Sequence, residues 1–176
     1  EMLRSLVGSE MCIRDSLCLM RHGKAEPYSM DKEDGLRHLT EKGRSDVMTM
    51  ASLAAQWWPM GTLRLWTSPS VRTCETAEIM GHQLHPTTVQ TWEAIEKGDF
   101  MPLHEEILSD ALAQSVLIVG HSPFLEDWTK KITGASFDYK TGALLCIDYD
   151  PYDGTYGKGK ILLLFHPQGA QMLFRK

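Results

Sequence analysis

Short apolar runs alternate with stretches of helical spacing along most of this chain. Each run is bounded by turn-forming residues, which is typical of buried strands. The predicted strands are Leu17–Met20, Leu63–Thr67, Thr88–Thr91, Val116–Val119, Leu144–Tyr149 and Ile161–Phe165. Alternation of strand and helix predicts an α/β domain, a three-layer sandwich in which helices flank a mostly parallel central sheet.

Four stretches between these runs predict helices, at residues 39–58, 68–84, 102–114 and 122–134. Thr40 and Ser68 are candidate N-caps, and Pro69 suits a first helical turn. Gly134 is placed to end the last of the four. The turn-rich segment 150–160 predicts a hairpin loop between the last two strands.

Composition narrows the classes of function. A chain of 176 residues with 43% hydrophobic residues is expected to form one domain. A net charge of −5 argues against binding to nucleic acid or to an anionic membrane, which would need a clustered basic excess. No apolar run reaches the roughly 18 residues of a membrane span. Without a heptad pattern, we expect a monomer.

The four cysteines are scattered, at Cys12, Cys18, Cys74 and Cys146. Because no CxxC pair occurs, we expect free buried thiols rather than a zinc or redox motif. Free thiols indicate a reducing compartment and therefore a cytoplasmic protein.

The first sixteen residues, EMLRSLVGSEMCIRDS, do not fit this pattern. They show no helical or strand period and lack the cationic start and apolar centre of a signal peptide. We interpret residues 1–16 as an N-terminal extension that resembles a translated cloning or adapter sequence, with a short native extension as the alternative. The single folded domain is then expected over residues 17–176.

Charged and polar residues follow the predicted strands at one edge of the sheet. Arg21, His22 and Gly23 come directly after the first strand, Arg72 stands one turn into the helix after the second, and His121 follows the fourth. Ligands of open α/β sheets bind beyond the carboxyl ends of the strands. Arg37, in the loop after the first strand, can fold over the same place. Each of these residues alone could be a solvated surface residue or a structural core residue. Only their convergence at one sheet edge predicts a site.

Arginine is a permanently charged, forked donor that suits phosphate oxygens, and histidine can act as a nucleophile, acid or base near neutral pH. Gly23 allows the backbone to turn tightly beside a ligand. The predicted helix N-termini at Ser68 and Ser122 add N–H donors. Together these residues predict an anion pocket that contains a nucleophile.

In this order, the segments LMRHGKAE, RHLTEKGR, SPSVRTCETA and VLIVGHSP resemble the histidine phosphatase (phosphoglycerate-mutase-like) superfamily. The short chain, the Lys-Ala-Glu after RHG and the segment KTGALLCIDYD are most similar to its SixA-like phosphohistidine phosphatase branch. The resemblance extends from residue 17 to about residue 166 and implies a phosphoglycerate-mutase-like fold.

The resemblance also implies roles. His22 would be the nucleophile that takes the phosphoryl group, and Arg21, Arg37 and Arg72 would hold the phosphate oxygens. His121 would complete the pocket. Neither a metal nor a cofactor is implied.

Whether the pocket holds a general acid decides the substrate class. An oxygen ester releases a poor leaving group and benefits from a carboxylic acid, whereas phosphohistidine releases imidazole and needs little help. No acidic residue follows His121 directly. Glu93, just after the third strand, is the best candidate, ahead of Glu26 and Glu75.

We therefore expect a metal-independent phosphatase that acts on phosphohistidine in proteins through phospho-His22. The alternatives are a phosphatase for small phosphoesters, such as sugar or nucleotide phosphates, and a non-catalytic phosphate-binding protein on the same fold. A phosphomutase is disfavoured because the chain lacks room for the elements that hold a second phosphate.

Overall fold

The computed structural model describes residues 16–58, 63–108, 115–149 and 156–174. Its strands are β1 (Ser16–Arg21), β2 (Leu63–Thr67), β3 (Thr88–Thr91), β4 (Ser115–Gly120), β5 (Leu144–Asp148) and β6 (Lys160–Phe165). Its helices are α1 (Glu41–Ala54), α2 (Val71–Leu84), α3 (Glu93–Lys97), α4 (Phe100–Pro102), α5 (Phe124–Thr133) and α6 (Pro167–Phe174). A 3-10 turn, η1 (Asp34–Leu36), precedes α1, and a π-helical segment, η2 (Leu103–Leu108), follows α4.

The described strands form one sheet in the order β3-β2-β4-β1-β5-β6. Strands β1, β2, β3 and β4 run parallel to their neighbours in this set, and β5 and β6 are antiparallel additions at one side. The central strand β4 is buried along its whole length. Parallel strands that are covered on both faces are expected to be almost continuously apolar. The sequences of β1 and β4 have this composition.

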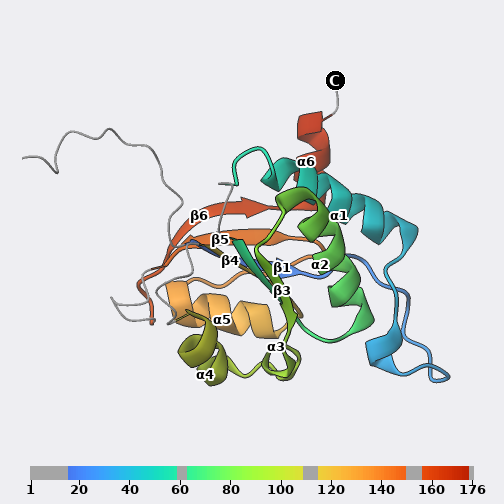
Figure 1. Cartoon of the computed structure of the whole chain (residues 1–176), viewed down its shortest axis with the longest axis horizontal. Helices are drawn as coiled ribbons and strands as arrows, with labels where there is room; N and C mark the ends of the chain where they lie inside the picture. Colours follow the sequence, from blue (N-terminus) through green and yellow to red (C-terminus); the bar gives the residue numbers. More distant parts are fainter. Residues whose placement is uncertain (1–15, 59–62, 109–114, 150–155, 175–176) are drawn as a thin grey trace, which may run out of the picture.

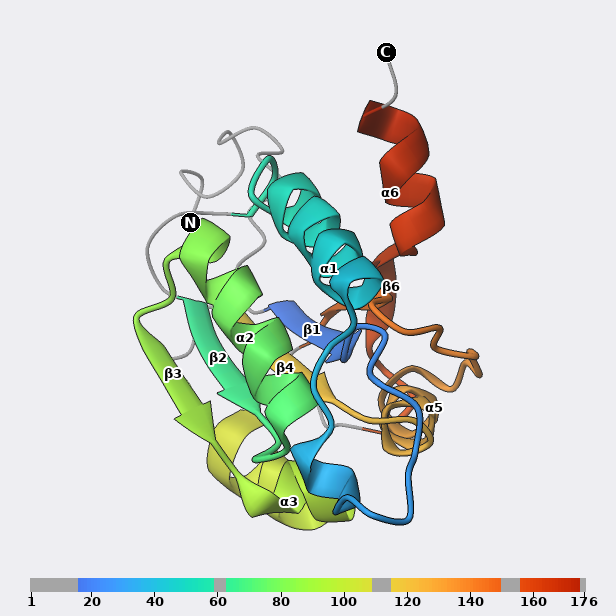
Figure 2. The same cartoon turned by 90° about the vertical axis from the view of Figure 1, so that its right-hand side faces the viewer.

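Helices cover both faces of this sheet. In Figures 1 and 2, α1, α2 and α6 lie on one face and α3, α4 and α5 lie on the other. Each face has its own apolar core: Met50, Met80 and Leu117 belong to the first, and Phe100, Ile118 and Trp128 to the second. The expected three-layer α/β architecture with a mostly parallel sheet is confirmed.

The predicted elements differ from the observed ones mainly at short helices. Every predicted strand is present within one residue of its expected ends. Thr40 caps α1 by accepting a hydrogen bond from the Gly43 amide, and Gly134 ends α5 in the left-handed conformation. Helices α3 and α6 were not predicted. Of the helix expected at 102–114, only residues up to Leu108 are described, as η2, and most of the predicted hairpin loop, 150–155, also lies outside the described residues.

Of the predicted extension, residues 1–16, only Ser16 lies within the described residues. Ser16 belongs to β1, where its hydroxyl pairs with that of Ser115. The domain boundary at residue 17 stays a prediction. Residues 1–15 lie outside the described residues. In the part of the chain that is described, no helix is both long and apolar enough to cross a membrane.

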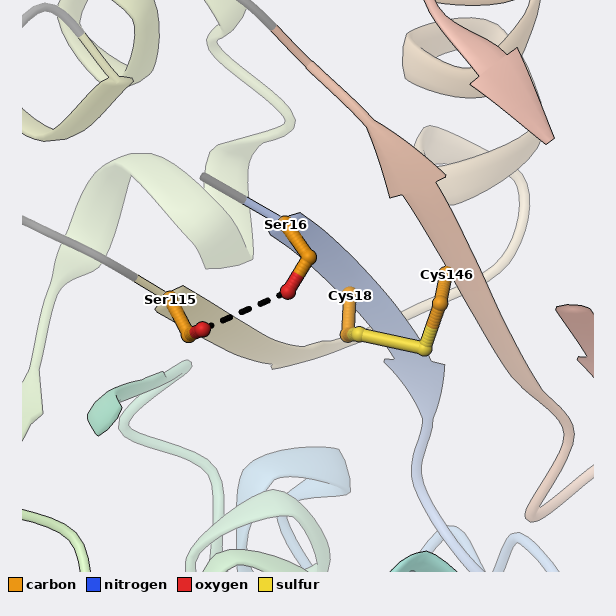
Figure 3. The surroundings of a disulfide bond; sticks show 4 residues. All are labelled: Ser16, Cys18, Ser115 and Cys146. Carbon is orange, nitrogen blue, oxygen red and sulfur yellow. Dashed lines mark hydrogen bonds between the residues drawn. A yellow bond between two sulfur atoms is a disulfide. The ribbon is translucent and has the colours of Figure 1, made fainter. Parts of the chain in front are cut away.

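The prediction of free thiols is wrong for two of the four cysteines. Cys18 on β1 and Cys146 on β5 form a disulfide bond (Figure 3). They are 128 residues apart in sequence, but the antiparallel register sets them directly opposite each other, with their Cα atoms 4.2 Å apart. Cys74 is a free, half-buried thiol, and Cys12 lies outside the described residues. The inference of a reducing compartment, which rested on free thiols, loses that support.

Candidate active site

The ends of two neighbouring parallel strands bring the two histidines together. In the register of β1 and β4, Arg21 lies opposite Gly120, so His22 and His121 are the next residues on adjacent strands. The His22 amide donates to the Gly120 carbonyl at 3.1 Å. The two imidazole rings have their centroids 5.3 Å apart, and both side chains are buried. A single phosphoryl group is therefore within reach of both rings.

Gly23 matters for packing rather than for an unusual backbone conformation. A Cβ atom at this position would lie 2.7 Å from a methyl group of Val47 and 3.0 Å from the Gly43 carbonyl oxygen on α1. A side chain would therefore push α1 away from the segment that follows His22. This close approach explains why glycine directly follows the histidine.

Local hydrogen bonding sets the tautomer of His22. Its Nδ1 lies 2.7 Å from the carbonyl oxygen of the adjacent Gly23. A carbonyl can only accept, so Nδ1 carries the proton and Nε2 keeps a free lone pair. Burial lowers the pKa of His22 to about 4, and the positive charges of Arg72, Arg21 and Arg37 act in the same direction. The ring is therefore neutral at physiological pH, as a nucleophile has to be.

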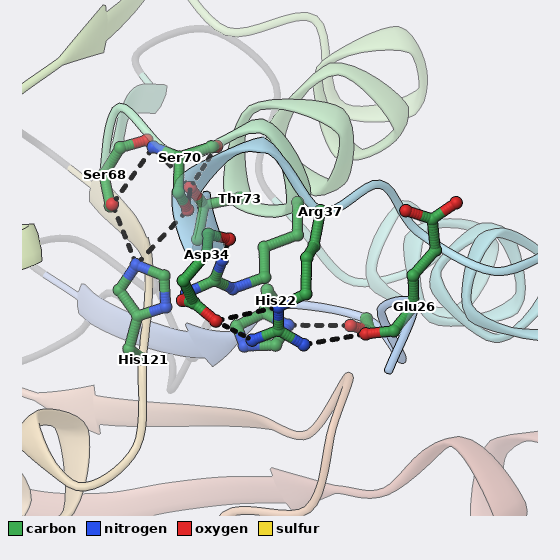
Figure 4. Close-up of polar contacts among 10 residues, drawn as sticks. His22, Glu26, Asp34, Arg37, Ser68, Ser70, Thr73 and His121 are labelled. Carbon is green, nitrogen blue, oxygen red and sulfur yellow. Dashed lines mark hydrogen bonds and ion pairs between the residues drawn. The ribbon is translucent and has the colours of Figure 1, made fainter. Parts of the chain in front are cut away.

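His121 is held by serines from the turn before α2. Its Nε2 lies 2.8 Å from the Ser68 hydroxyl and 3.4 Å from the Ser70 hydroxyl (Figure 4). Burial lowers the pKa of His121 to about 3, helped by His22 and Arg72. The prediction that Ser68 caps α2 is wrong, because that helix begins at Val71 with Ser70 as its N-cap. Ser68 instead orients an imidazole, a role that spacing along the chain did not reveal.

Three guanidinium groups converge on the same place. Arg21 ends β1 and donates to the Tyr139 carbonyl, while Arg72 projects from the first turn of α2 and is only 8% exposed. Arg37 lies at the end of η1 and donates to the Glu26 carbonyl at 2.7 Å. The buried Nε groups of Arg21 and Arg72 have no hydrogen-bond partner among the described residues. Unpaired buried donors beside two neutral imidazoles fit an anion.

These groups line one cleft of about 520 Å³. The side chains and backbone around it come from the β1 end, the segment before α1, the start of α2, α3 and the β4 end. Its lining residues are Arg21, His22, Lys24, Ala25, Asp34, Arg37, Arg72, Glu96, His121, Ser122, Pro123, Phe124 and Thr141. The cleft thus unites the five predicted basic site residues, which are distant from one another in the sequence.

Asp34 also lines the cleft, and sequence reasoning missed it. Its carboxylate accepts from Arg37 Nε at 2.9 Å and from an Arg72 terminal nitrogen at 3.0 Å. Although desolvation favours a higher pKa for Asp34, the charges of Arg72 and Arg37 outweigh it and hold that pKa below its ordinary value. Its position three residues before Arg37 was the only signal in the sequence.

Glu93 does not reach the cleft, contrary to prediction. Its carboxylate is exposed and pairs with Lys97 at 2.7 Å, one turn later on α3, and this contact lowers the pKa of Glu93. Glu96, three residues further along the same short helix, lines the cleft instead. Residues 93–97 are helical, and that helix turns Glu96 rather than Glu93 toward the cleft. A role for either carboxyl as a general acid stays a prediction.

The weaker candidates have structural contacts. Glu75 accepts from the Leu39 amide at 2.7 Å and pairs with His38 and Arg44, which fastens the segment before α1 to α2. The Glu26 carboxylate pairs with Lys32 at 2.8 Å. Among the residues that the structure describes, no group of three or more histidine, cysteine, aspartate or glutamate side chains could hold a metal ion.

Comparisons with solved structures agree with this fold. The protein histidine phosphatase SixA complexed with tungstate superimposes with a TM-score of 0.75 at 21% identity, over 88% of this chain and 98% of that one. A putative phosphohistidine phosphatase SixA from Agrobacterium tumefaciens gives 0.71 at 21% identity, over 88% and 99%. A mycobacterial glucosyl-3-phosphoglycerate phosphatase complexed with VO3 gives 0.59 at 11% identity, over 85% and 98%.

Sequence comparison identifies the family. No curated protein matches the chain. The profile of the histidine phosphatase superfamily (branch 1) matches residues 17–116, which carry His22, Arg37 and Arg72. This match covers more than half of the chain, and the first three predicted motifs lie inside it. The chain therefore belongs to the histidine phosphatase superfamily.

Proposed function

We propose that this protein is a phosphohistidine phosphatase that acts on proteins through a phospho-His22 intermediate. The observation that carries the proposal is the arrangement around His22: a neutral ring with Nε2 unprotonated, a second imidazole 5.3 Å away, and three guanidinium groups lining the same cleft. This arrangement supports the proposal, because His22 could act as the nucleophile and the guanidinium groups could balance the charge of a phosphoryl group.

The first half-reaction is transfer of the phosphoryl group to His22. The Nε2 lone pair attacks phosphorus in line, the phosphorus–nitrogen bond of the substrate breaks, and the released imidazole takes a proton from solvent. Arg21, Arg37 and Arg72 balance the charge on the transferring oxygens, which is the main requirement of a loose phosphoryl-transfer transition state. His121, held by Ser68, has its ring centroid 5.3 Å from that of His22 and would contact the same phosphoryl group.

In the second half-reaction, water attacks the phosphorus of phospho-His22. The bond to Nε2 breaks, inorganic phosphate leaves, and the neutral ring is restored. The low pKa of His22 means that the ring leaves as neutral imidazole rather than being trapped as a cation. The three arginines supply the positive charge on which this chemistry depends, so we expect activity to survive EDTA.

None of the acidic residues that line the cleft is buried, and this favours phosphohistidine as the substrate. Asp34 is held ionised by two arginines, and Glu96 is exposed at the cleft. An imidazole leaving group needs no strong proton donor. The substrate partner is then a protein that presents a phosphorylated histidine side chain. The expected cytoplasmic location, the monomeric state and the lack of nucleic-acid or membrane partners stay predictions.

Phosphatase activity on small phosphoesters is the second candidate, because Glu96 lines the cleft. A carboxyl group in this place could protonate an alkoxide leaving group. Glu96→Gln tests this role, and Glu93→Gln, an exposed carboxyl three residues earlier on the same helix, is its matched control.

The deciding experiment measures phosphate release from a phosphohistidine protein and from a panel of sugar and nucleotide phosphates, with EDTA present. We expect kcat/KM to favour phosphohistidine protein and neither variant to change it. If small phosphoesters are the better substrates and Glu96→Gln slows only their hydrolysis, the second candidate is correct. A wild-type protein that binds phosphate but hydrolyses none of these substrates would be the non-catalytic binder.

A further inference from the structure

An internal carboxylate occupies the space between two of the three arginines. Asp34 Oδ1 accepts from Arg37 Nε at 2.9 Å and pairs with a terminal nitrogen of Arg37 at 2.8 Å. Two nitrogens of this guanidinium group thus share one carboxylate oxygen. Its Oδ2 accepts from Arg72 at 3.0 Å, and the Asp34 backbone carbonyl accepts from the other terminal nitrogen of Arg72 at 2.7 Å. Figure 4 shows this carboxylate beside His22 and His121.

These contacts use the donors that a phosphoryl group would need. Arg37 gives Nε and one terminal nitrogen to Asp34, and its other terminal nitrogen donates to the Glu26 carbonyl. Both terminal nitrogens of Arg72 donate to Asp34, and only its Nε has no partner among the described residues. A phosphoryl group can therefore engage both guanidinium forks fully only after the Asp34 carboxylate has moved away.

The segment that carries Asp34 can move without exposing the core. The turn η1 contains no buried residue, and Leu36 within it is 51% exposed. Half of the Asp34 side chain is exposed as well. Segments with few buried apolar contacts open at low free-energy cost. The charge of Asp34 persists at neutral pH, because the same arginines lower its pKa.

We propose that Asp34 is an internal competitor for the anion pocket, a carboxylate that holds Arg37 and Arg72 until a phosphoryl group displaces it. An anion on the same chain competes at a high effective concentration. The apparent affinity for any external anion is then its intrinsic affinity multiplied by the fraction of molecules in which Asp34 is detached. Weakly bound carboxylates then fail to occupy the pocket, whereas a tightly held phosphoryl group still does. The proposal requires only that the cleft binds phosphate, which the proposed function also assumes.

Isothermal titration calorimetry with inorganic phosphate and with malonate tests this without relying on catalysis. Asp34→Asn keeps the size of the side chain and removes its charge, and Asp31→Asn makes the same change on the same loop, at a residue outside the cleft lining. We expect Asp34→Asn to bind each anion at least about tenfold more tightly than the wild type does, because one charged hydrogen bond is worth at least that much. The factor should be similar for the two anions. Asp31→Asn should bind them as the wild type does.

Two results would overturn the proposal. Weaker phosphate binding by Asp34→Asn would mean that the carboxylate aligns the arginines, and unchanged binding would mean that the contact carries no free energy. If the variant does not fold, hydrogen exchange of the wild type decides instead. Saturating phosphate should speed exchange of the amides at residues 31–36, and slower exchange there would contradict displacement.

The outcomes separate this inference from the proposed function. If the wild type hydrolyses no phosphorylated substrate but Asp34→Asn binds phosphate more tightly, the phosphatase assignment fails and the internal competitor stands. If the protein is an active phosphatase whose phosphate affinity is unchanged by Asp34→Asn, the phosphatase assignment stands and the internal competitor fails.

Discussion

The two sides of the cleft are built in different ways. On one side, Arg21, His22 and His121 stand at the ends of β1 and β4, and Arg72 at the first turn of α2, where the sheet and both cores hold them. On the other side, Asp34 and Arg37 come from a largely exposed segment before α1. His22, Arg72 and His121 on the strand-end side are buried, and both histidines have lowered pKa values.

This difference suggests a division of labour. The strand-end side is preorganised, since its groups are oriented by backbone carbonyls and buried hydroxyls. The loop side is held by the ion pairs of Asp34 with Arg37 and, across the cleft, with Arg72, and half of the Asp34 side chain is in solvent. Preorganised groups contribute most to transition-state stabilisation, and loops contribute more to access and selection. The following experiments test that division.

Loss of His22 is expected to have the largest effect. His22→Ala removes the proposed nucleophile, so kcat should fall by about four orders of magnitude or more, as for other nucleophiles. Phosphate release assays measure this, and circular dichroism checks that the variant is folded. Substantial remaining turnover would show that water attacks the substrate directly and that His22 is not the nucleophile.

The arginines of the two sides should respond unequally to the same change. Arg72→Lys removes a buried fork, and we expect kcat/KM to fall by about 100-fold or more, the range for a lost transition-state donor. Arg37→Lys, on the exposed side, should cost about tenfold or less, because two of its three nitrogens already serve Asp34 and the third serves Glu26. Equal losses would show that the loop side is as preorganised as the strand side.

The buried histidines should make stability depend on pH. The folded-state pKa of His22, about 4, lies below its ordinary value of 6.5, so the unfolded chain binds more protons between these pH values. Stability is therefore full above about pH 6.5 and is lost as pH falls toward 4. Relative to His22→Asn, the wild type should lose about 2 kcal/mol of unfolding free energy between pH 7 and pH 5. Urea melts at the two pH values measure this, and parallel losses in both proteins would contradict the burial of a neutral ring.

Loss of Ser68, which contacts His121, should have a smaller effect than loss of His22 or of the Arg72 fork. Ser68→Ala leaves His121 Nε2 with only the Ser70 hydroxyl at 3.4 Å, and we expect kcat to fall about tenfold with little change in KM. Ser29→Ala makes the same substitution in the exposed loop, outside the cleft lining, and should leave kcat unchanged. If Ser29→Ala lowered kcat and Ser68→Ala did not, the exposed side of the cleft rather than the strand-end side would depend on its serine hydroxyl.

The division also explains which parts of the site could be predicted from the sequence. His22, Arg21 and His121 follow apolar runs directly, so locating the strands locates these residues. Asp34 and Glu96 lie on a turn and a helix that are too short to leave a periodic signal, whereas Glu93 was predicted because it stands just after the third strand. The role of Ser68 depends on a neighbour 53 residues away.

By itself, the sequence determined the strands, the main helices, the α/β class and the five basic residues of the cleft, because strand period, caps and flanking residues are local properties. Tertiary structure alone decided the Cys18–Cys146 bond, the partner of Ser68 and the bridge from Asp34 to two arginines. Those contacts join residues that are distant in the chain, and they depend on register and on side-chain direction, neither of which a local pattern contains.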